Sequence, residues 1–137
     1  MAVPIRFNES RHLEVEVTLD NIQTTFIIDT GANRTTMDYA FGLSNGIIPE
    51  LTESTGGGIG NIQMEIYKSI IDLFKVGELE VKHQEMSYLD LSHVLSAFKE
   101  KRNITHITGI LGAEFLEKHA AIIDYQARYL YIRSSGP

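Results

Sequence analysis

The sequence contains no cysteine and no long apolar run, and each absence excludes a class of protein. Without cysteine, the chain can form neither a disulfide framework nor a thiolate metal site. No apolar stretch approaches the roughly 20 residues with which a helix crosses a bilayer. The segment from Met1 to Arg11 also lacks the basic region and apolar stretch of a signal peptide. We therefore expect no membrane segment and assign the chain to the cytoplasm by default.

Clustered positive charge is also scarce. The chain carries 18 acidic and 12 basic residues, which gives a formal net charge of −6. Nucleic-acid binding needs Lys and Arg gathered on one surface. The basic cluster of Lys99, Lys101 and Arg102 is interrupted by Glu100 and is more typical of a solvated helix end. We therefore expect no nucleic-acid partner.

Two further catalytic or ligand-binding patterns are missing. The sequence has no motif of a serine or cysteine nucleophile. Metal-ligand spacing is absent among the five histidines, which are His12, His83, His93, His106 and His119. We expect no metal and no other cofactor.

The remaining composition is that of a globular protein. Hydrophobic residues make up 43% of the 137 residues and charged residues 22%, which is enough for a buried core in a single domain. The last four residues, Ser134 to Pro137, resemble a linker in composition. We therefore predict one domain at 1–133, followed by a tail at 134–137.

The first half of the chain shows the two-residue period of β-strands. Every second residue is apolar from Leu13 to Leu19, and Asp20-Asn21 supplies a turn. A second strand, rich in β-branched residues, follows from Ile22 to Ile28. It ends in three consecutive apolar residues, which indicates burial on both faces. The pattern predicts a hairpin whose second strand leads directly into Asp29.

The middle of the chain combines an irregular segment with strands. We predict irregular structure from Leu43 to Gly60, because this segment contains Pro49 and ends with four glycines among its last five residues. Strand-like sequence follows from Ile62 to Val76. After the break at Gly77, a short continuation is predicted from Leu79 to Val81.

A helix is predicted from Leu91 to Arg102, with Asp90 as its N-cap. An apolar stripe at helical spacing, typical of core contact, consists of Leu91, Val94, Leu95 and Phe98.

The last third repeats the organisation of the first. A strand is predicted from Ile104 to Leu111, ending at Gly112, and a short helix from Ala113 to His119. A closing hairpin then pairs Ala121–Ile123 with Tyr129–Ile132. An apolar strand followed by a glycine-containing turn thus occurs near residue 29 and again near residue 112.

Asp29, within Asp29-Thr30-Gly31, is the strongest candidate for a catalytic residue. Amide hydrolysis needs one group to activate water and another to supply a proton. Two carboxylates within hydrogen-bonding distance share one proton and can fill both roles. Because the chain has a single Asp-Thr-Gly, a two-fold dimer would have to supply the second carboxylate. The alternative is that Asp29 only caps the end of the strand.

Three segments resemble landmarks of the retropepsin-like aspartic peptidases, the single-lobe relatives of pepsin. Phe26–Thr35 is similar to their active-site segment, and Ile107–Leu116 is similar to the two-apolars-then-glycine segment that supports the catalytic loop in that family. Thr55–Gly60 falls where the family carries its flap, the hairpin that closes over substrate. Ile123-Asp124-Tyr125 resembles the Asp-Tyr hairpin that often follows in bacterial members.

This resemblance implies an all-β, single-lobe acid-protease barrel with one amphipathic helix and one short helix after the second glycine turn. It implies an aspartic endopeptidase that acts on peptide or protein substrates as a homodimer. The catalytic residues it implies are Asp29, Thr30 and Gly31: Thr30 locks the turn with its hydroxyl, and Gly31 permits close approach. The implied substrate contacts are Ala32, Asn33, Arg34, Gly57, Gly58, Ile59, Gly60 and Ile110.

Two positions depart from the viral members of that family. The viral enzymes pair an Asp that follows the Ala with an Arg that follows the second glycine, but this chain has Asn33 and Ala113 there. The joint loss is self-consistent, because one buried charge left alone would be costly. We therefore expect a different dimer contact. The helix at 91–102 is an addition to the viral pattern, and Tyr67, just beyond the glycine loop, is expected to be a packing residue.

Two alternatives to a dimeric peptidase stay open. One is a non-catalytic peptide-binding or dimerisation module with the same fold, and the other is a strictly monomeric protein. A phosphate-binding role for the glycine loop is disfavoured, because no helix pattern begins after Gly60. We expect turn, cap or surface roles for Asp38, Asp72, Asp90 and Asp124.

Overall fold

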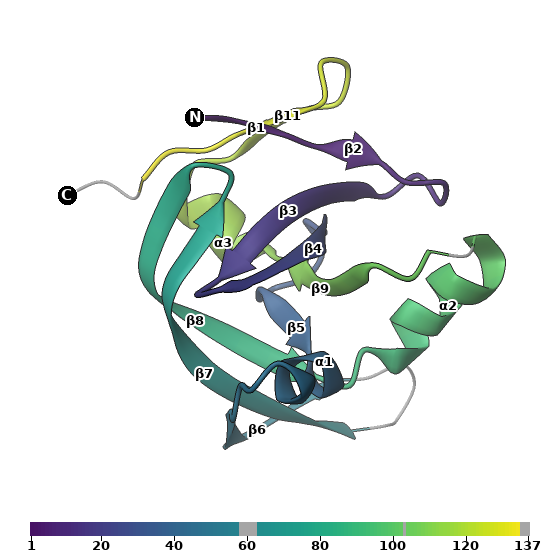
Figure 1. The fold of residues 1–137 in the computed structure, drawn as a ribbon, viewed down its shortest axis with the longest axis vertical. Coiled ribbons are helices and arrows are strands. Elements are labelled where there is room, and N and C mark those ends of the chain that lie inside the picture. Colours follow the sequence, from purple (N-terminus) through teal and green to yellow (C-terminus); the bar gives the residue numbers. More distant parts are fainter. Residues whose placement is uncertain (58–62, 103, 135–137) are drawn as a thin grey trace.

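The computed structural model describes residues 1–57, 63–102 and 104–134 (Figure 1). In these residues the chain is mostly β-structure with short helices. The helices are α1 (Tyr39–Ser44), α2 (Ser92–Arg102) and α3 (Ala113–Lys118). The strands are β1 (Ala2–Pro4), β2 (Arg6–Phe7), β3 (Leu13–Leu19), β4 (Ile22–Ile28), β5 (Thr36–Asp38), β6 (Glu50–Gly57), β7 (Gln63–Val76), β8 (Leu79–Leu89), β9 (Ile107–Leu111), β10 (Ile122–Asp124) and β11 (Tyr129–Tyr131).

The larger sheet closes into a barrel. Its strand order is β2-β3-β4-β9-β5-β8-β7-β6. An additional pairing of β3 with β7 closes the strands from β3 to β7 in this order into a ring. This closing contact is antiparallel and places Val17 opposite Val76. Closure leaves no free edge among the strands of the ring, and β2 and β6 extend the sheet outside it. The expectation of an all-β barrel lobe is confirmed.

The centre of the barrel brings together strands that are far apart in the sequence. β4 pairs in parallel with β9, with Ile28 opposite Leu111. β5 lies on the other side of β9, antiparallel to it, and is parallel to β8. As a result, the ends of β4 and β9 lie at the same edge of the sheet. The two glycine-containing turns of the sequence, after Ile28 and at Gly112, therefore lie next to each other.

The core lies inside the barrel. Its fully buried side chains come from most strands and from α3, and the largest include Phe26, Phe74, Tyr88 and Phe115. The ring of Phe74 contacts Phe26 on one side and Phe115 on the other, at centroid distances of 6.4 and 5.6 Å. Burying a side chain of this size contributes about 1.5–3 kcal/mol. α3 is therefore a structural part of the barrel end.

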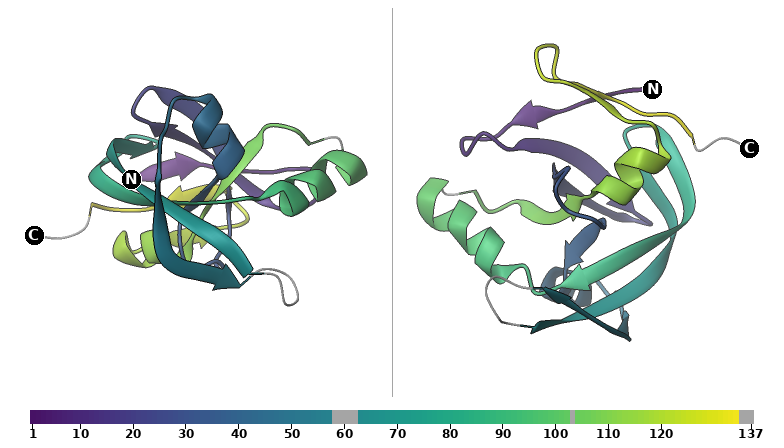
Figure 2. Two further views of the ribbon diagram at one scale, coloured as in Figure 1. Left: turned by 90° about the horizontal axis from the view of Figure 1, so that it is seen from below. Right: turned by 180° about the vertical axis from the view of Figure 1, so that it is seen from behind.

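The two ends of the chain form a separate small sheet. Its order is β1-β11-β10, and it lies across the end of the barrel near α3 (Figures 1 and 2). Leu130 of β11 and the following Ile132 are buried, and the Met1 amino group donates to the Ile132 carbonyl at 2.6 Å. The predicted closing hairpin is present as β10 and β11.

α2 packs on the outside of the barrel, beside the segment that enters β9 (Figure 2). Phe98 covers Ile27 together with Ile104 and Ile107, forming a second apolar cluster. The Asp90 carboxylate caps the helix by accepting the Ser92 N–H at 2.9 Å. Hydrogen bonds from the Ser92 hydroxyl and N–H hold the pKa of Asp90 below its ordinary value. None of the described helices is long and apolar enough to cross a membrane.

Several predicted element boundaries were wrong. The segment 43–60 is not irregular throughout, because it contains the end of α1 and all of β6. Two contacts produce these elements: β6 pairs with β7, the next strand in the chain, and the Asp38 carboxylate caps α1 by accepting the Phe41 N–H at 3.2 Å. β8 extends to Leu89 because it pairs with β7 and β5, whereas β9 begins at Ile107. In the stripe predicted for α2, Val94 is 39% exposed.

Candidate active site

Asp29 lies at the end of β4, where the chain leaves the barrel core. The three residues before it, Phe26-Ile27-Ile28, are buried, and Asp29 itself is exposed. Its backbone N–H donates to the Leu111 carbonyl at 3.0 Å, which continues the pairing of β4 with β9. Its carboxylate accepts the Gly31 N–H at 2.9 Å. The carboxylate is thus oriented by its own loop and open to solvent.

Two glycines let β9 and the turn after it lie directly against the Asp29 loop and the strands on either side of it. A Cβ added at Gly112 would lie 2.5 Å from the carbonyl carbon and oxygen of Arg34. A Cβ at Gly109 would lie 2.5 Å from the Phe26 ring and 2.6 Å from the Thr36 carbonyl oxygen. Such distances are not compatible with a side chain. Gly112 therefore lies directly behind the candidate catalytic loop, and Gly109 lets β9 lie close to β4 and β5.

Thr35 joins this loop to two neighbouring elements. Only 1% of its surface is exposed. Its side-chain oxygen accepts the Gly112 N–H at 3.1 Å, and its carbonyl accepts the Ser87 N–H of β8 at 3.2 Å. Its own N–H donates to the carboxylate of Glu114, in the first turn of α3. The sequence assigned Thr35 and Glu114 no role, although both lie in the segments that carried the resemblance.

Asn33 and Ala113, which replace the viral charge pair, are held by main-chain contacts. The Ala113 N–H donates to the Ala32 carbonyl at 2.7 Å, and the Glu114 N–H donates to the Asn33 carbonyl at 3.2 Å. These bonds attach the loop to α3 without a charged pair at the two positions. The Asn33 side chain is exposed.

The predicted substrate contacts lie in three places. Ala32, Asn33 and Arg34 follow Asp29 on the same loop, and the Arg34 guanidinium is 66% exposed with Glu85 at 3.9 Å. Ile110 is half-buried on β9 and lies opposite Ile27, two residues before Asp29. Gly57 ends β6, where it pairs with Gln63 of β7. Gly58, Ile59 and Gly60 lie outside the described residues.

Tyr67 packs at the base of the β6–β7 hairpin, as expected. Its ring stacks on Tyr39 with 4.2 Å between centroids, and its hydroxyl donates to the Glu65 carboxylate at 2.8 Å. This hydrogen bond is the main reason that the pKa of Tyr67 is raised to about 12. The hydroxyl therefore stays protonated at neutral pH.

The other aspartates that the sequence singled out match their expected structural roles. Asp38 caps α1, and its second oxygen accepts the Leu91 N–H at 3.0 Å. Asp124 accepts the N–H groups of Gln126 and Ala127 in the terminal hairpin. Asp72 is exposed on β7. Within the described ranges, no group of three or more His, Asp or Glu residues is arranged to hold a metal ion.

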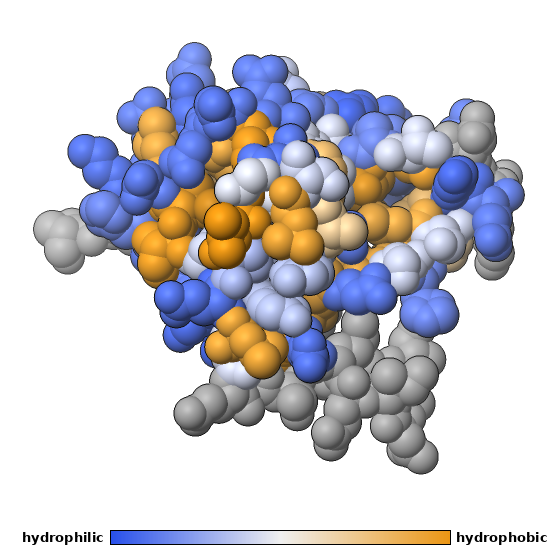
Figure 3. All heavy atoms as spheres, turned by 60° about the horizontal axis from the view of Figure 1, so that its bottom comes forward, coloured by the Kyte–Doolittle hydropathy of each residue, from blue (hydrophilic) through white to orange (hydrophobic). Residues whose placement is uncertain are grey.

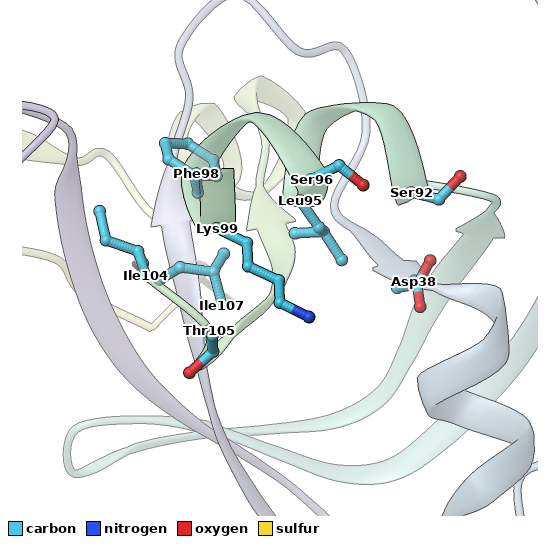
Figure 4. A pocket seen from close by; sticks show the side chains of 9 residues that line it. All are labelled: Asp38, Ser92, Leu95, Ser96, Phe98, Lys99, Ile104, Thr105 and Ile107. Carbon is cyan, nitrogen blue, oxygen red and sulfur yellow. The ribbon is translucent and has the colours of Figure 1, made fainter. Parts of the chain in front are cut away.

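A pocket of about 330 Å³ lies between α2 and β9, away from the Asp29 loop. Figure 4 shows Leu95, Phe98, Ile104 and Ile107 around it, with Asp38 at one side. Its walls thus include the apolar cluster that attaches α2 to the barrel. We interpret it as imperfect packing of the added helix.

Apolar side chains are also exposed on the face that carries α1 and β6 (Figure 3). They include Leu43, Ile48 and Leu51, which are 46%, 87% and 59% exposed. Figure 3 shows apolar and polar side chains interspersed on this face. Exposed apolar residues of this kind are common on protein surfaces, so this face alone indicates no partner.

Three solved structures share this architecture. A retropepsin-like aspartic protease from Rickettsia conorii is 16% identical with a TM-score of 0.67, covering 95% of this chain and 97% of that protein. The retroviral protease-like domain of Ddi1 from Leishmania major is 16% identical with a TM-score of 0.62, covering 88% and 87%. The EIAV protease, solved with the inhibitor HBY-793, is 17% identical with a TM-score of 0.58, covering 82% and 91%. At such identities the likeness shows the fold.

The sequence itself gives the family. No curated protein matches the chain. The family model described as "Aspartyl protease" matches residues 15–115, which include β4, the Asp29 loop, β9 and the start of α3. The chain therefore belongs to the aspartyl protease family and has a retropepsin-like fold.

Proposed function

We propose that this chain is one subunit of a homodimeric aspartic endopeptidase. The observation that carries the proposal is the geometry of Asp29: an exposed carboxylate follows the buried end of β4, on a loop that is hydrogen-bonded to β9 and α3. A two-fold axis beside this loop brings two copies of Asp29 together. Membership of the aspartyl protease family supports the same conclusion.

The chemistry follows from the paired carboxylates. Two such groups in contact cannot both ionise, so the pair holds a single proton. The ionised group takes a proton from the attacking water, while the protonated group polarises the carbonyl of the scissile bond. In each subunit, the Gly31 N–H fixes one oxygen of Asp29 at 2.9 Å. Thr30 and Gly31 complete the loop at the dimer axis.

The substrate is a peptide or protein segment bound in an extended conformation between the subunits. Asn33 and Arg34 contact its backbone, with side chains that are exposed beside the catalytic loop. Ala32 and Ile110 line the floor of the cleft. The glycine-rich segment of the sequence that begins at Gly57, the last residue of β6, and continues through Gly58, Ile59 and Gly60 acts as the flap that closes over the substrate.

The dimer contact differs from that of the viral enzymes. Asn33 and Ala113 carry no charge, and the loop is attached to α3 through main-chain bonds within the same subunit. An ion pair at these positions therefore plays no part in holding the dimer.

The decisive test replaces Asp29 with Asn. Asp29→Asn is expected to keep the fold and the dimer, because Asn preserves the size of the side chain and an acceptor for the Gly31 N–H. The variant cannot share a proton between two carboxylates, so it is expected to abolish cleavage of a library of mixed peptides. Asp72→Asn is the matched control, since Asp72 is an exposed carboxylate on β7. Cleavage that persists in Asp29→Asn would contradict the mechanism.

Inhibitor binding separates a peptidase from a binding module with the same fold. A statine-type peptide mimics the tetrahedral intermediate, so an assembled carboxylate pair binds it more tightly than the matching substrate peptide. The wild type is expected to show this preference, and Asp29→Asn is expected to lose it. Equal affinity of the wild type for both peptides would indicate a non-catalytic module.

A further inference from the structure

The carboxylate of Glu114 lies against the loop that follows Asp29. Glu114 is in the first turn of α3, and its Oε1 accepts the backbone N–H of Thr35. Its own backbone N–H donates to the Asn33 carbonyl at 3.2 Å. Residue 114 therefore binds the loop through both its main chain and its side chain.

The bond to Thr35 matters because Thr35 is buried. With 1% of its surface exposed, its N–H has little access to water as a replacement partner. A buried donor that loses its acceptor carries the full cost of desolvation. Main-chain contacts of residues 112 and 113 attach the same loop, but neither reaches this N–H. Glu114 is thus the group that satisfies the buried end of the loop.

The position of residues 32–35 determines the position of Asp29. The Ala32 N–H donates to the Asp29 carbonyl at 3.2 Å, and the Gly31 N–H fixes the carboxylate, so the segment from 29 to 32 forms one tight turn. This turn is anchored on one side by Leu111 and on the other by the contacts with α3. A loop released from α3 would shift the carboxylate, and displacement of a catalytic group by about 1 Å can lower a rate about 100-fold.

We propose that Glu114 is a positioning residue, whose carboxylate holds the loop at 32–35 against α3 and so sets the place of the Asp29 carboxylate. The proposal rests on the proposed peptidase function. Glu114 is not a catalytic residue, because it reaches the loop from the side of α3 and acts through Thr35.

The first experiment compares Glu114→Ala, Glu114→Gln and Glu117→Ala by steady-state kinetics on one peptide substrate. Glu114→Ala is expected to lower kcat by about 10- to 100-fold with little change in KM, because the loop is misplaced while the cleft persists. Glu114→Gln is expected to recover kcat to within about threefold, since its amide oxygen accepts the same hydrogen bond. Glu117 is an exposed residue of α3, so Glu117→Ala is expected to match the wild type.

The second experiment needs no catalytic activity. Amide hydrogen exchange at Thr35 is expected to be at least about 10-fold faster in Glu114→Ala, to stay slow in Glu114→Gln, and to be unchanged at Phe26 in the core of the barrel. Slow exchange at Thr35 in Glu114→Ala would overturn the proposal, as would a kcat for Glu114→Gln as low as that of Glu114→Ala. A wild type that cleaves nothing would refute the peptidase function, and exchange at Thr35 would still decide whether Glu114 holds the loop.

Discussion

At the scale of single residues, the candidate site depends on close contact between two backbones. Gly112 lies against the main chain of Arg34, which cannot move without shifting the loop. Gly31 is different: a Cβ there would lie 3.3 Å from Asp29 Oδ1, at the end of a side chain that can rotate. The same substitution at the two glycines should therefore have different consequences.

We expect Gly112→Ala to lower the free energy of unfolding by about 1–3 kcal/mol or more, because the added carbon collides with backbone atoms inside a well-packed region. Gly31→Ala is expected to change the stability far less, although it moves the Asp29 carboxylate and so lowers activity. Denaturant unfolding of both variants beside the wild type measures the difference. Equal stabilities of the two variants would show that the contact at Gly112 is not tight.

At the scale of elements, Asp38 joins two helices that are far apart in the sequence. One oxygen caps the start of α1 and the other accepts the Leu91 N–H at the entry to α2. A single carboxylate at the end of β5 thus fixes the first turn after that strand and also fixes where the added helix begins.

Replacing Asp38 by Ala is expected to destabilise the protein by about 1–2 kcal/mol, the typical cost of losing a helix cap with an additional hydrogen bond. Asp38→Asn should cost less, because its side chain keeps one acceptor oxygen. Thermal unfolding followed by circular dichroism compares these variants with Asp72→Ala, whose carboxylate is exposed on β7. An Asp38→Ala variant as stable as Asp72→Ala would show that the bridge between α1 and α2 contributes little.

At the scale of the whole molecule, the proposed chemistry needs two chains. Each chain contributes one Asp29 and a formal charge of −6, so the subunits repel each other at long range. Salt screens this repulsion over about 10 Å at 0.1 M. Association and catalysis should therefore change together with concentration and ionic strength.

Activity per chain is expected to fall on dilution, and added salt is expected to shift this fall to lower protein concentration. An excess of Asp29→Asn chains mixed with wild type should suppress activity, because mixed dimers hold only one Asp29. Sedimentation at the same concentrations tests whether the loss of activity follows the loss of dimer. Constant activity per chain in samples that sediment as monomers would rule out the shared site.

Local pattern predicted much of the fold. The alternation at 13–19 and the apolar end of the second strand gave β3 and β4 with their observed bounds, and the closing hairpin was also found. These segments were predictable because their periodicity directly reports which face is buried. β6 and α1 were missed, because a turn-rich sequence became regular only through pairing with β7 and capping by Asp38.

Glu14 shows the limit of that periodicity. The alternation of β3 places it on the exposed face, yet it is 1% exposed and its carboxylate lies 2.8 Å from both Arg6 and His106. The segment between α2 and β9 covers that face and provides His106 as a partner. No pattern within β3 itself contains this information.

The sequence by itself determined the family and the two barrel strands that precede Asp29, and it singled out Asp29-Thr30-Gly31 as the candidate site, because each is a local property of neighbouring residues. The tertiary structure alone decided how the Asp29 loop is held. Thr35 and Glu114 are 79 residues apart and meet only because β4 pairs with β9. Because Thr35 is buried, its polar groups need partners within the protein, since water has little access to replace them.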